Sequence, residues 1–200
     1  MSYRYFFTIK FLPAQADCAL LAGRCIKTLH GFMAVNEAAA NKVGICFPKW
    51  NDRNIGSAIG FVCHDETALT GLSYQPYFTL MRSEGLFEIS PVKTVPEAAP
   101  EVRFVRNQTI DKSFLDSKRR RLRRAEKRAI EAGRDFTPVS EEERTFLPFH
   151  SIPMGSKSSG KDFVLQVQVE DEERPNDGGY NMYGLATNVD WRGTVPLIAL

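Results

Sequence analysis

Residues 155–161 read GSKSSGK, which matches the Gly-x-x-x-x-Gly-Lys spacing of a phosphate-binding P-loop. Asp162 follows where that motif needs a hydroxyl group to hold magnesium, and its carboxylate would face the nucleotide's own negative charge. A P-loop opens a helix, whereas the residues that follow predict a half-buried strand with Phe163, Leu165, Val167 and Val169 at every second position. The nucleotide interpretation therefore fails, and the serines of this loop, Ser156 and Ser158 among them, need another role.

Histidine is the usual general acid or base near neutral pH, and the chain has three histidines, at positions 30, 64 and 150. His30 is predicted to end the first helix, with Gly31 as a left-handed cap. A cation at a helix C-terminus interacts favourably with the helix dipole, which would explain His30 structurally. The same position could tune a general acid or base. On the residues alone, both interpretations stay open.

The four cysteines, at positions 18, 25, 46 and 63, include no closely spaced pair. Cys63 and His64 are a lone adjacent pair, which is not the ligand spacing of a zinc site. In a reducing compartment, buried thiols are the simplest interpretation. We therefore expect no structural metal and no cofactor.

Positive charge is concentrated in one segment. Residues 118–128, KRRRLRRAEKR, hold eight basic residues and one acid, whereas the rest of the chain holds 18 basic and 23 acidic residues. A charged helix is usually a solvated face whose bases are balanced by acids at i+4, but Glu126 is the lone acid in this segment. The imbalance favours a nucleic acid as the partner.

No DNA-docking motif accompanies this helix, so structured RNA such as a short hairpin is the compatible ligand. Just upstream, Arg106 and Gln108 are two residues apart on a predicted strand and would project from the same face. Arginine pairs with guanine O6 and N7, and glutamine pairs with adenine N6 and N7. Two exposed polar residues at a strand edge remain the alternative interpretation.

The elements that position these groups follow a repeated strand-helix-strand order in the first hundred residues. The expected strands cover about 3–11, 42–48, 58–63 and 86–93, and the expected helices cover about 15–30 and a short segment from 65. This order is typical of a ferredoxin-like βαββαβ domain, which we assign to residues 1–98. The proline-rich segment 91–100 is predicted to be a linker or crossover.

The second half, residues 99–200, is predicted to be an RNA-hairpin-binding domain that contains the Arg-rich helix, which makes the whole chain α+β. A strand at 102–110 should lead into this helix, which a capping box at 113–116 would start and Gly133 would close. A thin apolar stripe should dock the helix on the body; its members are Leu115, Leu122, Ala125 and Ala129.

The composition places few other limits on the protein. Two hundred residues, 43% of them hydrophobic, can bury a proper core. No stretch approaches the ~20 apolar residues of a membrane span, and the N-terminal YRYFFTIKFLP is better explained as a first strand than as a signal peptide. We therefore expect a cytoplasmic protein with no membrane partner.

Five motifs spread along the whole chain resemble those of CRISPR-associated endoribonucleases of the type I-F subtype, which cut the repeat transcript to make guide RNAs. In order, the motifs are Leu29-His30, VGICFP at 43–48, Arg106-Asn107-Gln108 with the Arg-rich helix, the Ser-rich loop 156–163, and Tyr183-Gly184-Leu185. Each motif is weak alone, but the order and the spacing of all five are specific.

The resemblance implies catalytic roles for four residues. His30 corresponds to the catalytic histidine, and Ser156 corresponds to the serine that holds the nucleophilic ribose. Ser158 is a second candidate for that contact. Tyr183 corresponds to a tyrosine that orients the histidine.

The resemblance also implies an RNA-binding surface. Arg106 and Gln108 match residues that read base edges in the repeat hairpin, and Phe163 matches an aromatic residue that stacks on the base at the bottom of the stem. The helix that enters the major groove of the hairpin carries Arg120, Arg121, Arg124 and Arg128.

The implied reaction needs no metal, because the 2′-hydroxyl of the RNA is the nucleophile and the products carry 2′,3′-cyclic phosphate and 5′-hydroxyl ends. The enzyme would keep the hairpin product and remain with the other subunits of the type I-F guide-RNA surveillance complex. The alternative is a non-catalytic subunit that binds structured RNA within a ribonucleoprotein. A scaffold for acidic protein partners makes poorer use of Arg106, Gln108 and Phe163.

Overall fold

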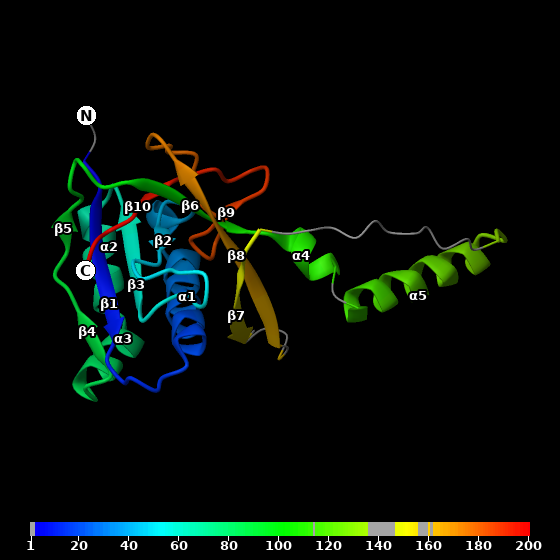
Figure 1. Ribbon diagram of the computed structural model, residues 1–200, viewed down its shortest axis with the longest axis horizontal. Helices are drawn as coiled ribbons and strands as arrows, with labels where there is room; N and C mark the ends of the chain where they lie inside the picture. The colour runs from blue at the N-terminus through cyan, green and yellow to red at the C-terminus, as the bar shows by residue number, and fades with distance from the viewer. Residues whose placement is uncertain (1–2, 114, 136–146, 156–159, 161) are drawn as a thin grey trace.

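The computed structural model describes residues 3–113, 115–135, 147–155, 160 and 162–200, and for 111–121 it describes the backbone alone. Two β-sheets make up the body of the protein, and one long helix, α1, packs between them (Figure 1). The α+β class expected from the sequence is confirmed.

The first sheet has the strand order β2-β3-β1-β4, and every neighbouring pair on this path is antiparallel. That order is the ferredoxin-like arrangement expected from the sequence. Two short helices, rather than one, connect β3 to β4. The elements in chain order are β1 (Tyr5–Phe11), α1 (Cys18–Val35), the 3₁₀ turn η1 (Glu37–Ala39), β2 (Gly44–Cys46), β3 (Ala58–Cys63), α2 (Glu66–Ser73), α3 (Pro76–Ser83) and β4 (Phe87–Ile89).

The segment predicted to be a linker contributes a short strand, β5 (Lys93–Thr94), which pairs with β1. Beyond it, the second sheet has the order β10-β6-β8-β7, and β9 pairs with β6 in parallel. Its strands are β6 (Glu101–Arg106), β7 (His150–Gly155), β8 (Asp162–Glu172), β9 (Ala186–Thr187) and β10 (Val195–Pro196).

Helix α1 starts where Asp17 accepts a hydrogen bond from the backbone N–H of Leu20 (3.0 Å), which is a normal N-cap. It ends at Val35, so the prediction that it stops at His30 with Gly31 as its cap is wrong. Phe32 and Met33 continue the buried stripe past the glycine, and their burial outweighs the weak helix propensity of one glycine. His30 therefore lies outside the last turn, and the helix-dipole explanation for it does not hold.

The stripe of α1 that faces the core packs against both sheets, which gives the two sheets one continuous hydrophobic core. Leu29 is fully buried among residues of the first sheet such as Ile45, and the second sheet contributes Ile152 and Leu165 to the same cluster. At the crossing of α1 and β7 the backbones are very close, because a Cβ atom placed on Gly23 would lie 2.1 Å from the carbonyl oxygen of Pro153. Glycine is therefore required where β7 crosses the helix.

Strand β8 follows the Ser-rich loop, as expected, but both of its faces are covered. Leu165 and Val167 point into the core, and Gln166 and Gln168 on the opposite face are also buried. The side chain of Gln168 satisfies its polar atoms by accepting a hydrogen bond from Asn107 Nδ2 (2.7 Å) and donating one to the carbonyl oxygen of Leu147 (2.8 Å). The alternating pattern showed the apolar face of this strand correctly and missed the burial of the polar one.

The strand predicted at 102–110 ends early. β6 stops at Arg106, and Asn107 accepts a hydrogen bond from the backbone N–H of Thr109 (3.0 Å) to cap a new helix, α4 (Gln108–Ser113). Arg106 and Gln108 therefore do not project from one strand face, because Gln108 belongs to the first turn of α4. The prediction of a shared face is wrong, since an asparagine side chain competes with strand pairing by capping a helix.

The Arg-rich helix is α5 (Leu115–Glu131), and Gly133 ends it as predicted. Gly133 has a φ of 62°, and the backbone N–H groups of Gly133 and Arg134 donate to the carbonyl oxygens of Ile130 and Ala129, which is a Schellman cap. The helix projects away from the two sheets (Figure 1). Leu122 is 43% exposed, so the prediction that this stripe docks the helix on the body is wrong.

By length and mean hydropathy (1.2) alone, α1 is apolar enough to cross a membrane, although no membrane span was expected from the sequence. Seven of its residues are buried in the protein, as in the core helix of a globular domain.

The predicted buried thiols are confirmed for Cys25, Cys46 and Cys63, and burial raises the pKa of the Cys46 thiol to about 12. Within the described segments, no group of three or more His, Cys, Asp or Glu residues is placed to hold a metal ion.

The close approach of α1 and β7 predicts opposite effects for two glycines of the same helix. Gly23→Ala should lower the free energy of unfolding by about 1–3 kcal/mol, because the new methyl group must push the Pro153 carbonyl away. Gly31→Ala should leave stability unchanged or raise it by up to about 1 kcal/mol, because nothing lies within 4 Å of that position and alanine favours the helix. Urea unfolding of the two variants tests this, and equal stabilities would contradict the packing described for Gly23.

Candidate active site

The turn at 181–185 carries one side of the candidate site. The side-chain oxygen of Asn181 accepts hydrogen bonds from the backbone N–H groups of Tyr183 (2.8 Å) and Leu185 (3.2 Å). The N–H of Gly184 donates to the Asn181 carbonyl oxygen (2.9 Å), and Gly184 has a φ of +74°, a conformation that favours glycine. The turn is therefore fixed by its own hydrogen bonds.

This turn is attached to the first half of the chain through Gly184. The Gly184 carbonyl oxygen accepts a hydrogen bond from the N–H of Ile45 in β2 (2.9 Å). A Cβ atom at position 184 would lie 2.8 Å from side-chain atoms of both Leu29 and Ile45. Because glycine permits that approach, the turn lies directly against α1 at the residue before His30.

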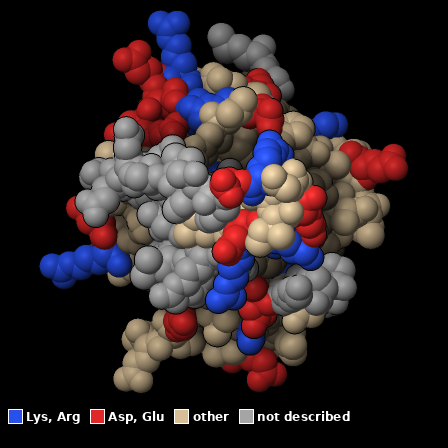
Figure 2. All heavy atoms as spheres, turned by 90° about the vertical axis from the view of Figure 1, so that its right-hand side faces the viewer, with Lys and Arg blue, Asp and Glu red and all other residues tan. Residues whose placement is uncertain are grey.

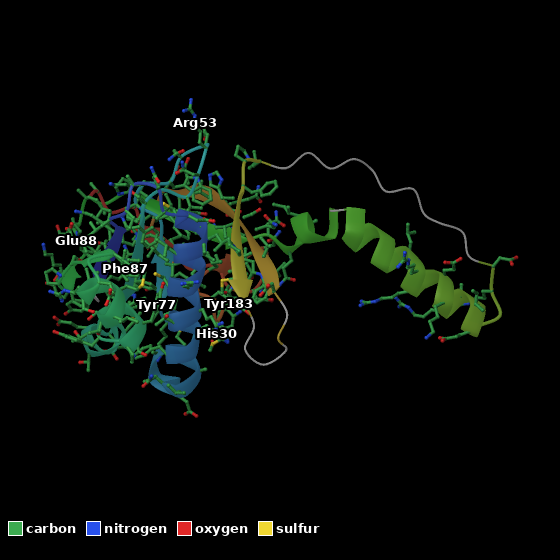
Figure 3. All side chains as sticks on the ribbon, turned by 90° about the horizontal axis from the view of Figure 1, so that it is seen from below. His30, Arg53, Tyr77, Phe87, Glu88 and Tyr183 are labelled. Carbon is green, nitrogen blue, oxygen red and sulfur yellow. The ribbon has the colours of Figure 1, made fainter. Side chains whose placement is uncertain are left out.

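The imidazole of His30 is held from two sides by the turn. Its Nδ1 lies 3.0 Å from the carbonyl oxygen of Met182, and its ring stacks on the ring of Tyr183 with centroids 5.1 Å apart and planes 19° apart. Figure 3 shows the two labelled side chains next to each other beside α1. Since a carbonyl oxygen can only accept, Nδ1 must carry the proton, and the neutral ring then has its lone pair on Nε2.

No partner for His30 Nε2 is found in the described part of the chain, whereas the other two histidines use this nitrogen in contacts. His64 Nε2 is 3.0 Å from Asp177 Oδ1, and His150 Nε2 is 2.7 Å from the carbonyl oxygen of Asn51. His30 is also half-buried, which limits its motion while leaving it accessible. The arrangement therefore suits a general base.

Tyr183 brings two more of the expected residues to the site. The guanidinium carbon of Arg106 lies 5.2 Å from the centroid of the Tyr183 ring, and the ring of Phe163 lies 6.0 Å from it at 57°. Arg106 reaches this position because β6 pairs with β9, where Arg106 is opposite Thr187. Arg106 Nε is buried and donates to no described group, which leaves this donor unsatisfied. The structure thus brings together His30, Arg106, Phe163 and Tyr183.

Ser156 and Ser158 lie outside the described residues. The residue before them, Gly155, is the last of β7, and a Cβ atom placed on it would lie 3.6 Å from Lys27 Nζ. Lys27 is three residues before His30 on the same helix. Gly155, the last described residue before Ser156, therefore lies beside the Lys27 side chain of α1.

The residues expected to bind RNA outside this cluster are exposed where they are described. Gln108 lies in the first turn of α4, and the side chains of Arg124 and Arg128 are exposed on α5, where Arg128 Nε donates to the Arg124 carbonyl oxygen (3.2 Å). Arg120 and Arg121 lie on the same helix, where the backbone alone is described. Figure 2 views the molecule from the side to which α5 projects and shows basic and acidic side chains interspersed there.

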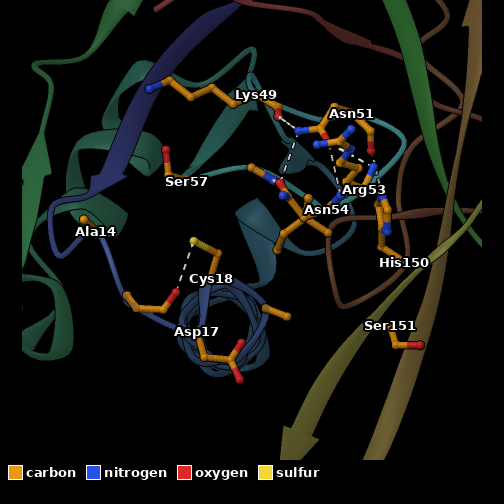
Figure 4. A pocket seen from close by; sticks show the side chains of 14 residues that line it. Ala14, Asp17, Cys18, Lys49, Asn51, Arg53, Asn54, Ser57, His150 and Ser151 are labelled. Atoms are coloured by element: carbon orange, nitrogen blue, oxygen red, sulfur yellow. Dashed lines mark hydrogen bonds between the residues drawn. The ribbon is translucent and has the colours of Figure 1, made fainter.

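A separate hollow of about 680 Å³ lies at the N-terminal end of α1, beside the loop that connects β2 to β3 (Figure 4). Its polar groups bind one another: the Asn51 side-chain oxygen accepts from the N–H groups of Arg53 (2.9 Å) and Asn54 (3.1 Å), and the Asn51 carbonyl oxygen contacts His150. None of the four clustered residues lines it. This hollow at the N-terminal end of α1 is therefore not the candidate active site.

Two contributors to the site were missed from the sequence. The Met182 carbonyl is a backbone group, so its side chain gives no signal for its role. Asn181 did give a signal in the sequence. An asparagine two residues before a Tyr-Gly pair is typical of a turn that the asparagine side chain closes.

The model of a family described as CRISPR-associated protein (Cas_Csy4) matches residues 6–197. The chain is thus a CRISPR-associated protein, and it belongs to the Cas_Csy4 family. The resemblance found in the five motifs is confirmed. No curated protein matches the chain. Among solved structures, it is similar to "Structure A of CRISPR endoribonuclease Cse3 bound to 19 nt RNA", with 17% identity and a TM-score of 0.39, over 97% of this chain and 100% of that one.

The hydrogen bond to Met182 predicts the tautomer of His30. In the neutral imidazole, Nδ1 should be the protonated nitrogen and Nε2 the unprotonated one, which is the reverse of the tautomer that predominates for a free histidine side chain. Nitrogen-15 NMR of histidine-labelled protein distinguishes the two, with His30→Gln used to assign the signal. An Nε2-protonated ring would mean that the bond to Met182 is not made in solution.

Proposed function

We propose that this protein is a metal-independent endoribonuclease that cleaves CRISPR repeat RNA at the 3′ base of its stem-loop. The observation that carries the proposal is the fixed imidazole of His30, which the Met182 carbonyl and the Tyr183 ring hold with the Nε2 lone pair available. Membership of the Cas_Csy4 family supports it.

The proposed reaction is attack by the 2′-hydroxyl of the RNA on the adjacent phosphorus. His30 Nε2 removes the hydroxyl proton as the new P–O bond forms. The bond to the 5′-oxygen of the next nucleotide breaks, water protonates that oxygen, and His30 returns its proton to the solvent. The products are a 2′,3′-cyclic phosphate and a free 5′-hydroxyl. Ser156, or alternatively Ser158, holds the ribose in line, and general-base catalysis contributes about 10²–10⁴-fold.

The proposal assigns RNA binding to residues 99–200 as a hairpin-binding domain, beside a ferredoxin-like domain at 1–98. Its projecting helix α5 suits the groove of a hairpin, because a helix that packs on the protein body could not enter it. The arginines proposed to contact the stem from this helix are Arg120, Arg121, Arg124 and Arg128.

Three further residues are proposed to read the base of the stem. Arg106 has a buried Nε without an acceptor among the described residues, and Gln108 is exposed just beyond it at the start of α4. Both side chains can bind base edges. Phe163 lies against Tyr183, and its ring is proposed to stack on the base at the bottom of the stem, beside His30.

In this proposal the protein keeps the hairpin product and stays with the other subunits of a cytoplasmic type I-F guide-RNA complex. A subunit that only bound RNA would use α5, Arg106 and Phe163 in the same way. It would not need a histidine held by both a carbonyl and an aromatic ring, and the proposal therefore favours catalysis.

Cleavage by the 2′-hydroxyl predicts a specific block. In a chelating buffer, repeat RNA should be cut, whereas the same RNA with 2′-deoxyribose just 5′ of the scissile phosphate should bind with similar affinity and stay intact. Gel assays with analysis of the product ends measure both. His30→Ala should abolish cleavage and keep hairpin affinity, and normal cutting of the deoxy RNA would contradict the mechanism.

The contact between His30 and Tyr183 predicts that the ring matters and the hydroxyl does not. Tyr183→Phe should keep a single-turnover rate close to wild type, because phenylalanine can stack on the imidazole in the same way. Tyr183→Ala should lower the rate by up to about 100-fold, since a poorly placed base acts inefficiently. Equal losses in the two variants would show that the hydroxyl group, and not the stacking, carries the role.

A further inference from the structure

A groove of about 420 Å³ runs between α1 and the end of the β7–β8 hairpin, next to the candidate active site. Leu20, Arg24 and Lys27 line it from the helix, and Pro153, Phe163 and Val164 line it from the hairpin. Neither the five motifs nor the proposed reaction gives this groove a role.

The groove is continuous with the site at one end. Phe163 belongs to both, and Lys27 lies three residues before His30 on α1. From there the groove follows α1 back toward Leu20. The elements proposed to hold the stem leave in another direction, because α4 packs on β8 and α5 projects away from the body (Figure 1). A strand that passes His30 therefore has a path along α1 that the stem does not occupy.

The lining combines apolar surface with positive charge. Leu20 is 40% exposed and Val164 is 39% exposed, so the groove presents apolar surface to the solvent. Lys27 forms no ion pair with any carboxylate in the described part of the chain, and Arg24 is exposed on the preceding turn. Asp162, at the start of β8, also lines the groove and partly offsets this charge. Cations along a path with apolar and aromatic side chains are typical of surfaces that bind single-stranded nucleic acid.

The spacing of the two cations fits an RNA backbone. Arg24 and Lys27 are one turn apart on α1, which separates their attachment points by about 5 Å, and long flexible side chains extend that reach. Successive phosphates in a single strand are separated by a distance that these side chains can span, so the two cations can contact neighbouring phosphates. A free phosphate or a nucleotide would contact the two cations alone and would not need the exposed apolar surface of Leu20 and Val164.

We infer that this groove binds the single-stranded RNA on the 3′ side of the cut, with Lys27 and Arg24 on its first phosphates. The inference rests on the proposed function and adds to it the site of the leaving strand. Two cations and a shallow apolar path bind a few nucleotides weakly. The groove thus helps to align the scissile phosphate and releases the leaving strand after cleavage, while the hairpin stays bound.

Two RNAs test the inference. The first is the repeat hairpin that ends at the nucleotide 5′ of the cut, and the second extends it by four 3′ nucleotides, with 2′-deoxyribose at the cut in both so that neither is cleaved. The wild-type protein should bind the extended RNA about tenfold more tightly at low salt. Its plot of log affinity against log salt should be steeper by about 1.4, since each single-strand phosphate contact contributes about 0.7.

The double substitution Arg24→Ala with Lys27→Ala should remove this difference and leave the affinity for the short hairpin unchanged. Lys93→Ala is the matched control, because Lys93 is an exposed lysine on β5, at the far side of the first sheet, and should change neither affinity. Equal binding of the two RNAs by the wild-type protein, or a difference in affinity that survives the double substitution, would overturn the inference about the groove. The proposed function would be unaffected by either result. Failure of the wild-type protein to bind the short hairpin would overturn the proposed function, and the groove with it.

Discussion

One hydrogen bond, from His30 Nδ1 to the Met182 carbonyl, joins residues that are 152 positions apart and gives the candidate site its chemistry. Without it, the imidazole could carry its proton on either nitrogen and turn away from the site. The bond exists because Asn181 closes the turn and Gly184 lets it lie against Leu29. Asn181 and Gly184 thus fix the backbone that places the Met182 carbonyl against His30 Nδ1, and this leaves the imidazole lone pair on Nε2.

The packing of α1 between two sheets supports the same hydrogen bond. A histidine on a helix that contacts a sheet on each side cannot drift relative to its partners, because protein interiors are close-packed and resist small displacements. The first sheet supplies the contact at Ile45, and the second sheet supplies β7 at Gly23 and Phe163 near Tyr183. By contrast, α5 projects away from the two sheets. Under the proposed function, the part that would contact an RNA groove is thus separated from the part that holds His30.

Much of the fold was readable because local patterns control it. The apolar alternation in β8, the ferredoxin-like strand order and the cap at Gly133 follow from short-range signals, and all three are confirmed. The two errors have different physical causes. α1 continues past Gly31 because Phe32 and Met33 find a core to fill, so tertiary burial overrode a local preference. The strand at Arg106 stops because the Asn107 side chain caps a helix, which is a local signal that the expected strand pattern ignored.

By itself, the sequence determined the residue types of the site, the concentration of charge in 118–128 and the family, because motif order and composition are properties of the chain. The tertiary structure decided which nitrogen of His30 is available, which residues surround Tyr183, and that a groove leads away along Lys27. Those properties depend on distances between segments that are far apart in the chain, and on a backbone carbonyl whose position no side chain encodes. They become defined only when the turn at 181–185 packs against α1.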